Sequence, residues 1–348
     1  MMWRLTVCGQ SSSSLVTPLS IAYNSGSRFL DCRRAMSQHG GRWRFAFFDR
    51  EPHALFGEEV KTRNAILFRI ENRDAPQRGQ SAIIETGAMR KWTSRTRGEL
   101  FNSIHFTSLE ALNIAEGIPK LEGALQSLAF NILKNTPNRF ESFCRKIGKC
   151  SIEDALKQDH SHFVYAGGTA YNFLNVFRKF SIDTGGQNPL SETPVHCLEF
   201  TTENDASAAF AILSSRLVFW LWHAQSDGFH VPGWFIRDLP FQPENFPPEN
   251  IPNEQMDRLS TLGACLWSKV QSHRFSSING GKLTYTFRPL SCNEERDQID
   301  SILVSASGLP ANMVVELKKF VRKIVVVDES DNKREHLKNY FTGGRMHV

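Results

Sequence analysis

The pattern of apolar and polar positions in the first 70 residues predicts strand, helix, strand, turn and strand. A short apolar run over residues 15–19 indicates a buried strand that ends near a proline. Apolar side chains at helical spacing over residues 26–38 predict a helix that glycines then end. Dense aromatic residues over 42–49 and alternation over 60–70 predict two more strands. We expect these last two strands to pair antiparallel across the turn between them.

The rest of the chain is predicted to be richer in helix. Residues 107–160 have mostly helical spacing, and Thr202 and Asp205 have the spacing of a capping box. Six prolines over residues 232–252 exclude a long helix there. A short strand and three helices are expected, in this order, over residues 81–86, 203–224, 253–272 and 293–323.

Length and composition are those of an ordinary globular protein of about two domains. The chain has 348 residues, 41% hydrophobic and 22% charged, which excludes a disordered or coiled-coil chain. Seven cysteines without a Cys-x-x-Cys pair favour a reducing compartment over a disulfide framework. Arg216 interrupts the most apolar segment, residues 206–222, which is too short and too polar to span a bilayer. We therefore expect a cytoplasmic protein without a membrane span.

No zinc site is expected, since no common ligand spacing is matched by Cys144, Cys150, His160 and His162.

Positive charge is concentrated near the N-terminus. Residues 1–100 hold 16 basic and 9 acidic side chains, whereas the remaining chain is slightly negative. A basic segment fits a polyanion partner such as nucleic acid. Two groups of basic residues support this expectation. The first lies at the predicted hairpin and consists of Arg42, Arg44, Arg50, Lys61 and Arg63. The second surrounds Trp92 and consists of Arg90, Lys91, Arg95 and Arg97. The alternative for the first group is a solvated basic face with weak ion pairs to Glu58 and Glu59.

Several motifs resemble those of one family of DNA-modifying enzymes. In the first 70 residues they are Leu15-Val-Thr-Pro-Leu-Ser20, the turn Leu55-Phe56-Gly57, and the aliphatic run from Ala65 to Phe68. This order is similar to the end of the catalytic domain of adenine-specific DNA methyltransferases. The comparison is with the fused type IIG restriction–modification enzymes and their stand-alone relatives. The later chain resembles the family's target-recognition domain through the helix over 206–222, then Ser226–His230, then Phe235–Pro240.

The resemblance implies an α/β fold in two parts. The C-terminal strands of a Rossmann-like methyltransferase sheet would be followed by a helix-rich α+β target-recognition domain. We expect the methyltransferase part over residues 1–85, a helical linker over 86–160, the recognition domain over 161–290 and a C-terminal helical segment over 291–348. The resemblance also implies double-stranded DNA as the partner.

Residue roles follow from the same resemblance. Phe56, in the turn between the two strands, would stack on a displaced adenine, and base stacking contributes about 1–3 kcal/mol. Its alternative role is a core residue in a tight turn. Tyr171 and Asn172 are candidates for base contacts, since asparagine pairs well with adenine, or else are packing and turn residues. Arg178 and Lys179 are further DNA-binding candidates.

Two family motifs are missing from the sequence. The family binds S-adenosylmethionine at a glycine-rich turn after a strand, and its catalytic loop is Asn/Asp-Pro-Pro-aromatic. No such turn precedes Leu15, and the only Pro-Pro pair, Pro247-Pro248, is followed by Glu249. We therefore expect no cofactor binding and no methyl transfer by this chain alone. Either a separate chain carries those motifs, or the gene is a truncated remnant. If a separate chain carries those motifs, we expect this chain to expose an apolar sheet edge with which the strands of the other chain would pair.

A Mg²⁺-dependent nuclease is the alternative enzyme. Asp49, Glu59 and Lys61 have the spacing of a site in which two carboxylates hold the metal beside a lysine. The Glu-x-Lys triplet is frequent by chance, and the same residues fit the methyltransferase hairpin. The nuclease hypothesis predicts a carboxylate pair around a shared metal.

Overall fold

The structure, a computed structural model, describes most of residues 12–324. The residues within this range that it does not describe are 51–52, 57–61, 71–74, 78, 110–113, 138, 158–161, 171–172, 183–189, 191–193, 242–251, 280 and 288–291. The chain divides into two compact units. The first consists of Met1–Asn131 with His223–Asp227, and the second of Ile132–Trp222 with Gly228–Val348.

A mixed five-stranded sheet forms the framework of the first unit. Its strands are β1 (Ser13–Pro18), β2 (Arg42–Phe48), β3 (Asn64–Ile70), β4 (Ile83–Arg90) and β5 (Thr107–Ser108), in the spatial order β1-β3-β2-β4-β5. β3 is antiparallel to both of its neighbours, so β1 and β2 run parallel. β2 and β4 are also parallel. The predicted order of elements and the predicted antiparallel pair are confirmed.

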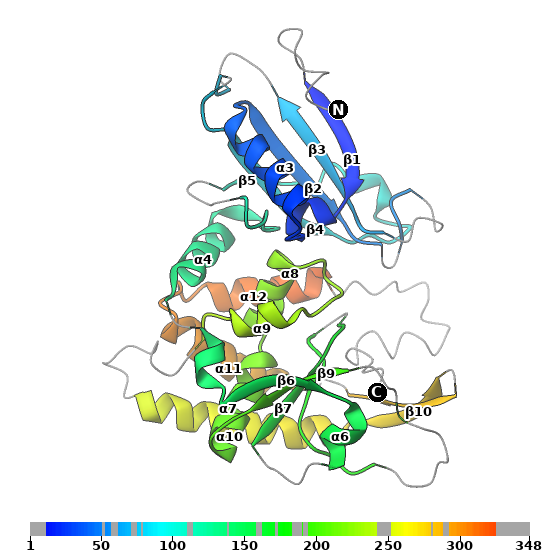
Figure 1. Cartoon of the computed structure of the whole chain (residues 1–348), viewed down its shortest axis with the longest axis vertical. Helices are drawn as coiled ribbons and strands as arrows, with labels where there is room; N and C mark the ends of the chain where they lie inside the picture. The colour runs from blue at the N-terminus through cyan, green and yellow to red at the C-terminus, as the bar shows by residue number, and fades with distance from the viewer. Residues whose placement is uncertain are drawn as a thin grey trace. The chain divides into compact units, whose positions relative to one another are not determined.

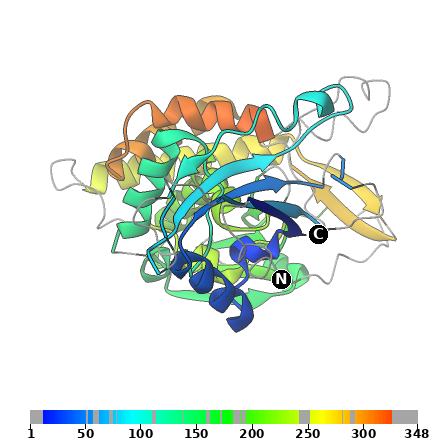
Figure 2. The ribbon, with the colours of Figure 1, turned by 90° about the horizontal axis from the view of Figure 1, so that it is seen from above.

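The chain between β1 and β2 forms the short helix α2 (Ser20–Tyr23) and then α3 (Ser27–Gln38). Figure 1 and Figure 2 both show α3 lying along one face of the sheet. Inside this unit, the guanidinium of Arg33 is fully buried and donates to the carbonyls of Ile21, Asn24 and Ala115. These bonds fix α2 and α3 to the chain that follows the sheet.

Alternation along β2 divides the sheet into a closed face and a more open one. Trp43, Phe45 and Phe47 are fully buried, whereas Arg42 and Arg44, which alternate with Trp43 and Phe45, are only partly buried. The open face is partly covered by a cluster that combines the ends of β2 and β3 with residues of the following loops. Its members are Ala46, Phe48, Leu55, Trp92 and Leu100, with Ile66, Phe68, Ile104 and Phe106 packed against them. The short helix η1 (Arg97–Glu99) precedes Leu100.

The second unit contains an antiparallel sheet, a hairpin and most of the helices. The sheet strands are β6 (Lys146–Cys150), β7 (Phe163–Gly167), β8 (Val176–Phe177) and β9 (Val195–Glu199), in the order β6-β9-β7-β8. The hairpin pairs β10 (Phe275–Asn279) with β11 (Lys282–Thr286). The helices are α4 (Gly123–Asn135), which begins in the first unit, α5 (Phe140–Phe143), α6 (Ile152–Lys157), α7 (Glu203–Leu213), α8 (Arg216–Gln225), α9 (Gly233–Arg237), α10 (Pro252–Ser272), α11 (Asn293–Ala306) and α12 (Met313–Ile324).

Close packing of α7 on α10 depends on one glycine. A Cβ atom at Gly263 would lie 1.9 Å from the backbone oxygen of Ser207, so no larger residue fits without a shift. Nearby, the buried Arg216 at the start of α8 pairs with the buried Asp300 of α11 at 2.8 Å. Asp300 also accepts the Arg216 backbone N–H, which satisfies a free donor at the N-terminus of α8.

The helix predictions were correct in part. The capping box of Thr202 and Asp205 is present, and α10 agrees with the predicted range. The prediction of one helix over 203–224 was wrong, because the chain breaks at Ser214-Ser215 into α7 and α8. Residues 293–323 likewise form two helices, with Gly308 at φ +65° and Pro310 between them. Residues 107–160 are not mostly helical, because they include β5 and β6.

The described chain is therefore mixed α/β, as expected. Within it we find no helix with the length and apolar character needed to cross a membrane.

Candidate nucleic-acid interface

Asp49, directly after β2, is the centre of a buried charge network. Its Oδ1 lies 2.7 Å from Nε of Arg63, and its Oδ2 lies 3.6 Å from Nζ of Lys91. The backbone N–H of Arg50 donates to Oδ1 at 2.7 Å. The sheet register brings these groups together, since β2 ends opposite the start of β3 and the end of β4. A buried carboxylate needs such partners, because its uncompensated desolvation costs several kcal/mol.

This network gives Arg63 and Lys91 an internal role that the sequence did not suggest. Their side chains are only about a tenth exposed and neutralise Asp49, whereas the sequence predicted contacts with phosphate. For the nuclease hypothesis, the same carboxylate would have to hold Mg²⁺ with two cations already against it. Glu59 and Lys61, which complete that hypothesis, lie outside the described residues.

The turn after β2 holds Phe56 at the surface. Leu55 is buried in the cluster with Phe48 and Trp92, whereas the next residue, Phe56, is 52% exposed. The Leu55 carbonyl accepts a hydrogen bond from Arg97, at 3.4 Å. Phe101 is also exposed, by 56%, and its ring centroid lies 5.7 Å from that of Phe48. Nothing in the sequence singled out Phe101 as a candidate, because the exposure of its side chain depends on how the loop packs.

A row of directly paired residues crosses the open face of the sheet. In spatial order the row is Ser14, Phe68, Arg44, Glu85 and Ser108, one from each strand. The Glu85 carboxylate accepts from Nε of Arg44 at 2.5 Å and from Nη1 of Arg42 at 3.0 Å. One carboxylate thus faces two guanidinium groups whose side chains are 32% and 35% exposed, so these three groups together keep one net positive charge.

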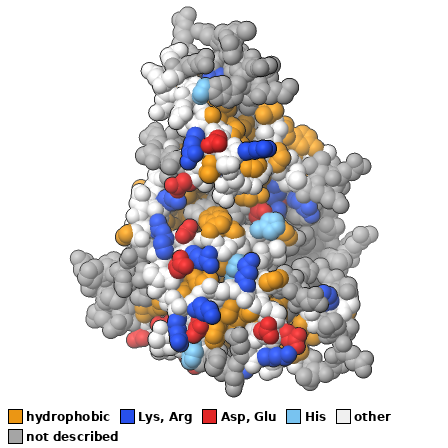
Figure 3. Space-filling view, viewed as in Figure 1, with side chains coloured by type: hydrophobic (Ala, Val, Ile, Leu, Met, Phe, Trp, Pro, Cys, Tyr) orange, Lys and Arg blue, Asp and Glu red, His pale blue; other side chains and the backbone are white. Residues whose placement is uncertain are grey.

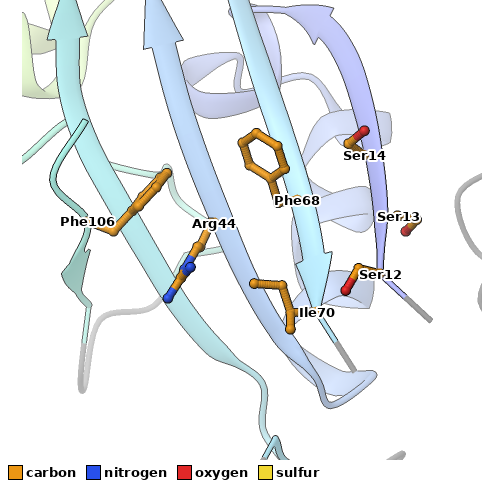
Figure 4. A pocket seen from close by; sticks show the side chains of 7 residues that line it. All are labelled: Ser12, Ser13, Ser14, Arg44, Phe68, Ile70 and Phe106. Atoms are coloured by element: carbon orange, nitrogen blue, oxygen red, sulfur yellow. The ribbon is translucent and has the colours of Figure 1, made fainter. Parts of the chain in front are cut away.

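A pocket of about 390 Å³ lies beside this row. Figure 4 shows Arg44 between the rings of Phe68 and Phe106 on this face, with three serines along β1 and the preceding residue. The lining residues are Ser12, Ser13, Ser14, Arg44, Phe68, Ile70 and Phe106. The Arg44 guanidinium lies 5.3 Å from the ring centroid of Phe106, a cation–π contact that orients its charge.

The second basic group is only partly at the surface. Arg90 and Trp92 are buried, and Arg90 donates to the Ser103 carbonyl and pairs with Glu122 at 3.3 Å. The structure therefore does not present Arg90 to a phosphate. Arg95 and Arg97, in the loop that follows, are exposed.

The candidates in the second unit also differ in exposure. Arg178 is buried and donates to Oγ of Ser207 at 2.9 Å, with Glu203 at 3.4 Å. Its charge is thus used within the unit. Lys179, the next residue, is exposed. Tyr171 and Asn172 lie outside the described residues.

A buried lysine in the first unit was not anticipated from the sequence. Nζ of Lys120 donates to the carbonyls of Ala224 and Ser226, at 3.0 and 2.5 Å. Burial lowers the pKa of Lys120 to about 7, against the opposing attraction of Asp227. Burial also holds the pKa of the adjoining His223 well below its usual value, and the charges of Lys91 and Lys120 act in the same direction. A lone lysine in a sequence gives no signal of such burial.

The described residues contain neither a glycine-rich turn after β1 nor a group of side chains placed to hold a metal. β1 leads through Pro18 and Leu19 directly into α2, without a glycine-rich turn. Pro247-Pro248 lies outside the described residues. In the part of the chain that the structure describes, no group of three or more His, Cys, Asp or Glu side chains is placed to hold a metal.

Basic and acidic side chains are interspersed on the face shown in Figure 3. The candidate DNA contacts at the surface are single basic residues and the exposed ring of Phe56. Among known proteins, no family model matches the sequence, and no curated protein matches it.

Proposed function

We propose that this chain is the DNA-recognition part of an adenine-specific DNA methyltransferase system. The observation that carries the proposal is the exposed ring of Phe56 beside the buried anchor Leu55. A half-exposed aromatic ring on a fixed turn can stack on a base displaced from the duplex, because every base presents a flat π-face. Exposure at this level favours the stacking role of Phe56 over the alternative of a core residue.

Phosphate contacts belong to the basic residues that the fold leaves accessible. In the first unit these are the exposed Arg95 and Arg97, together with the partly buried Arg42, Arg44 and Arg50. In the second unit Lys179 is accessible. Arginine and lysine contacts with phosphates position a protein on the duplex without specifying a sequence.

A separate polypeptide would supply S-adenosylmethionine binding and the catalytic loop. The edge of β1 that faces away from β3 supports this part of the proposal. Among the described strands only β3 pairs with β1, and Leu15 and Val16 of β1 are 39% and 47% exposed. Natural edge strands are commonly protected by charges, yet β1 carries none. An edge strand without charged residues, in which Leu15 and Val16 are partly exposed beside two serines and a threonine, fits the surface on which strands of a second chain would continue the sheet.

The proposal is tested by a fluorescence titration of duplex DNA with the purified full chain at about 50 and about 200 mM salt. One duplex is fully paired and the other carries a mismatched adenine, which costs less to displace. We expect affinity to fall steeply with salt for both. Phe56→Ala should weaken binding to the mismatched duplex by about 5- to 150-fold, from a stacking contribution of about 1–3 kcal/mol. The fully paired duplex should be affected less.

Phe101→Ala is the matched control, since Phe101 is an equally exposed phenylalanine of the same unit. Equal losses for the two variants, or no binding by the folded chain, would contradict the proposal. Cleavage that requires Mg²⁺ and is lost in Lys61→Ala would instead support the nuclease.

A further inference from the structure

Two cysteine thiols lie side by side on neighbouring strands of the second unit. Cys150 is the last residue of β6, and Cys197 lies on β9, which pairs antiparallel with β6. Cys197 is paired with Gly148 and Cys150 with Val195, so the thiols occupy diagonal positions on the same face of the sheet. Both thiols are half-buried, so solvent reaches them.

The local structure leaves room for the two sulfurs to approach each other. β6 is an edge strand, and Cys150 stands at its end, where backbone movement disturbs few hydrogen bonds. Gly148 has no side chain, and a Cβ atom built there would meet no atom within 4 Å. The position opposite Cys197 is therefore open. Diagonal cross-strand cysteines need such movement, because a disulfide brings the Cβ atoms to about 3.5–4.5 Å.

The two thiols are also unequal in acidity. The hydrogen bond that Cys197 donates lowers the pKa of Cys150, because it stabilises the thiolate. The same bond and burial raise the pKa of Cys197, which stays a thiol. An accessible thiol with a lowered pKa beside a second thiol is the arrangement of cysteines that respond to oxidants.

We propose that Cys150 and Cys197 form an oxidisable thiol pair that hydrogen peroxide converts to a disulfide between β6 and β9. The Cys150 thiolate attacks one peroxide oxygen and the O–O bond breaks. Cys150 becomes a sulfenic acid, and the other oxygen leaves as hydroxide, which takes up a proton to become water. The Cys197 sulfur then attacks the Cys150 sulfur. The S–S bond forms, the S–O bond breaks, and the released hydroxyl leaves as water with the Cys197 proton. Two thiols are oxidised and one peroxide is reduced to two waters.

The test treats the full chain with hydrogen peroxide, alkylates the remaining thiols and digests the protein with trypsin. Cleavage after Lys149 and Lys157 places Cys150 in a short peptide, and residues 180–216 contain Cys197 as their only cysteine. We expect mass spectrometry to find these two peptides joined, with the link lost after dithiothreitol. Without peroxide, Cys150 should react with iodoacetamide at least about tenfold faster than Cys144, whose pKa burial raises to about 12.

Variants distinguish the attack of Cys150 on the peroxide from the later attack of Cys197 on Cys150. Cys197→Ser should stop the reaction at a sulfenic acid on Cys150, which dimedone traps, and Cys150→Ser should abolish the link. Cys32→Ser, which removes an exposed thiol of the other unit, is the control and should leave the link unchanged. The proposal is overturned if the wild-type chain forms no Cys150–Cys197 link before either sulfur is oxidised further. It is also overturned if Cys150 reacts no faster than Cys144. The alkylation comparison needs no variant, so it holds even where a substitution prevents folding.

Discussion

Lys120 is a buried lysine whose hydrogen-bond acceptors lie more than 100 residues away in the sequence. The carbonyls of Ala224 and Ser226 hold its ammonium group, and Asp227 adds a favourable charge. Burial nevertheless dominates and moves the pKa down to about 7. A lysine with a lowered pKa in the folded state makes stability depend on pH, because the unfolded chain binds the proton more tightly.

The sign of this dependence follows from the two pKa values. In the unfolded chain a lysine titrates near 10.4, and in the fold Lys120 titrates near 7. The cost of the buried charge is fully present below pH 7 and declines as the pH rises toward the unfolded value. We therefore expect the free energy of unfolding to rise between pH 7 and 9.5, because the folded protein loses the charge on Lys120. The rise should be at most about 1.4 kcal/mol per pH unit.

Thermal unfolding of wild-type and Lys120→Met proteins across this range measures the effect. The difference in Tm should shift in favour of wild type as the pH rises, because only the wild type loses the charge penalty. Lys134→Met, at an exposed lysine, should show no such shift. Parallel pH profiles for wild type and Lys120→Met would show that Lys120 titrates normally.

At the scale of elements, β1 is the part of the sheet most exposed to unwanted pairing. Its backbone faces β3 on one side, and Val16 is half-exposed on an uncharged strand. A lysine at position 16 should discourage edge-to-edge association while costing little stability, since surface substitutions usually change stability by about 0.5 kcal/mol or less. We expect Val16→Lys to reduce association of the purified chain, measured by light scattering at rising concentration.

Val315→Lys provides the comparison, because Val315 is a similarly exposed valine on α12. It should leave the association of the chain unchanged. An unchanged scattering profile for Val16→Lys, or equal effects of the two substitutions, would mean that the β1 edge does not drive association.

The break between α7 and α8 shows what periodicity alone misses. Apolar residues continue at helical spacing on both sides of Ser214-Ser215, and both serines are buried. The Ser215 hydroxyl accepts the backbone N–H of Val218, which caps the second helix, and Asp300 of α11 binds its first N–H. The second helix therefore starts where a distant carboxylate and a local hydroxyl satisfy its free donors.

At the scale of the whole molecule, the first unit is discontinuous in sequence. Residues 223–227 belong to it, although the chain on both sides of them belongs to the second unit. A fragment over residues 1–137, which keeps α4 whole, would leave Lys120 without its two acceptors. We expect this fragment to be less stable than the same unit in the full chain, and to co-purify with residues 138–348 when the two are expressed together. Lys120→Ala should weaken this association, measured by the recovery of the second fragment.

A fragment over 1–137 that unfolds at the same temperature as the full chain would contradict this expectation. In that case the segment 223–227 would be unnecessary for the first unit. Far-UV circular dichroism of the isolated fragment tests this directly.

Local patterns were sufficient for several elements. The antiparallel pair β2–β3, the helix α3, the capping box of α7 and the helix α10 were all predicted, because each rests on neighbouring residues.

The candidate site was harder to predict. The basic residues were visible as a group, but the division into buried and accessible ones was not, since Arg63, Arg90 and Arg178 are held by partners far away in sequence.

The sequence by itself determined the order of the first strands and helix, the mixed α/β class and the exposed turn residue as a candidate. Periodicity and turn chemistry act over a few residues, so they can be read without the fold. The tertiary structure decided which basic side chains form buried ion pairs, that Lys120 is buried, and that Cys150 lies beside Cys197 on a neighbouring strand. These outcomes depend on strand register and desolvation, which arise only when distant segments pack together.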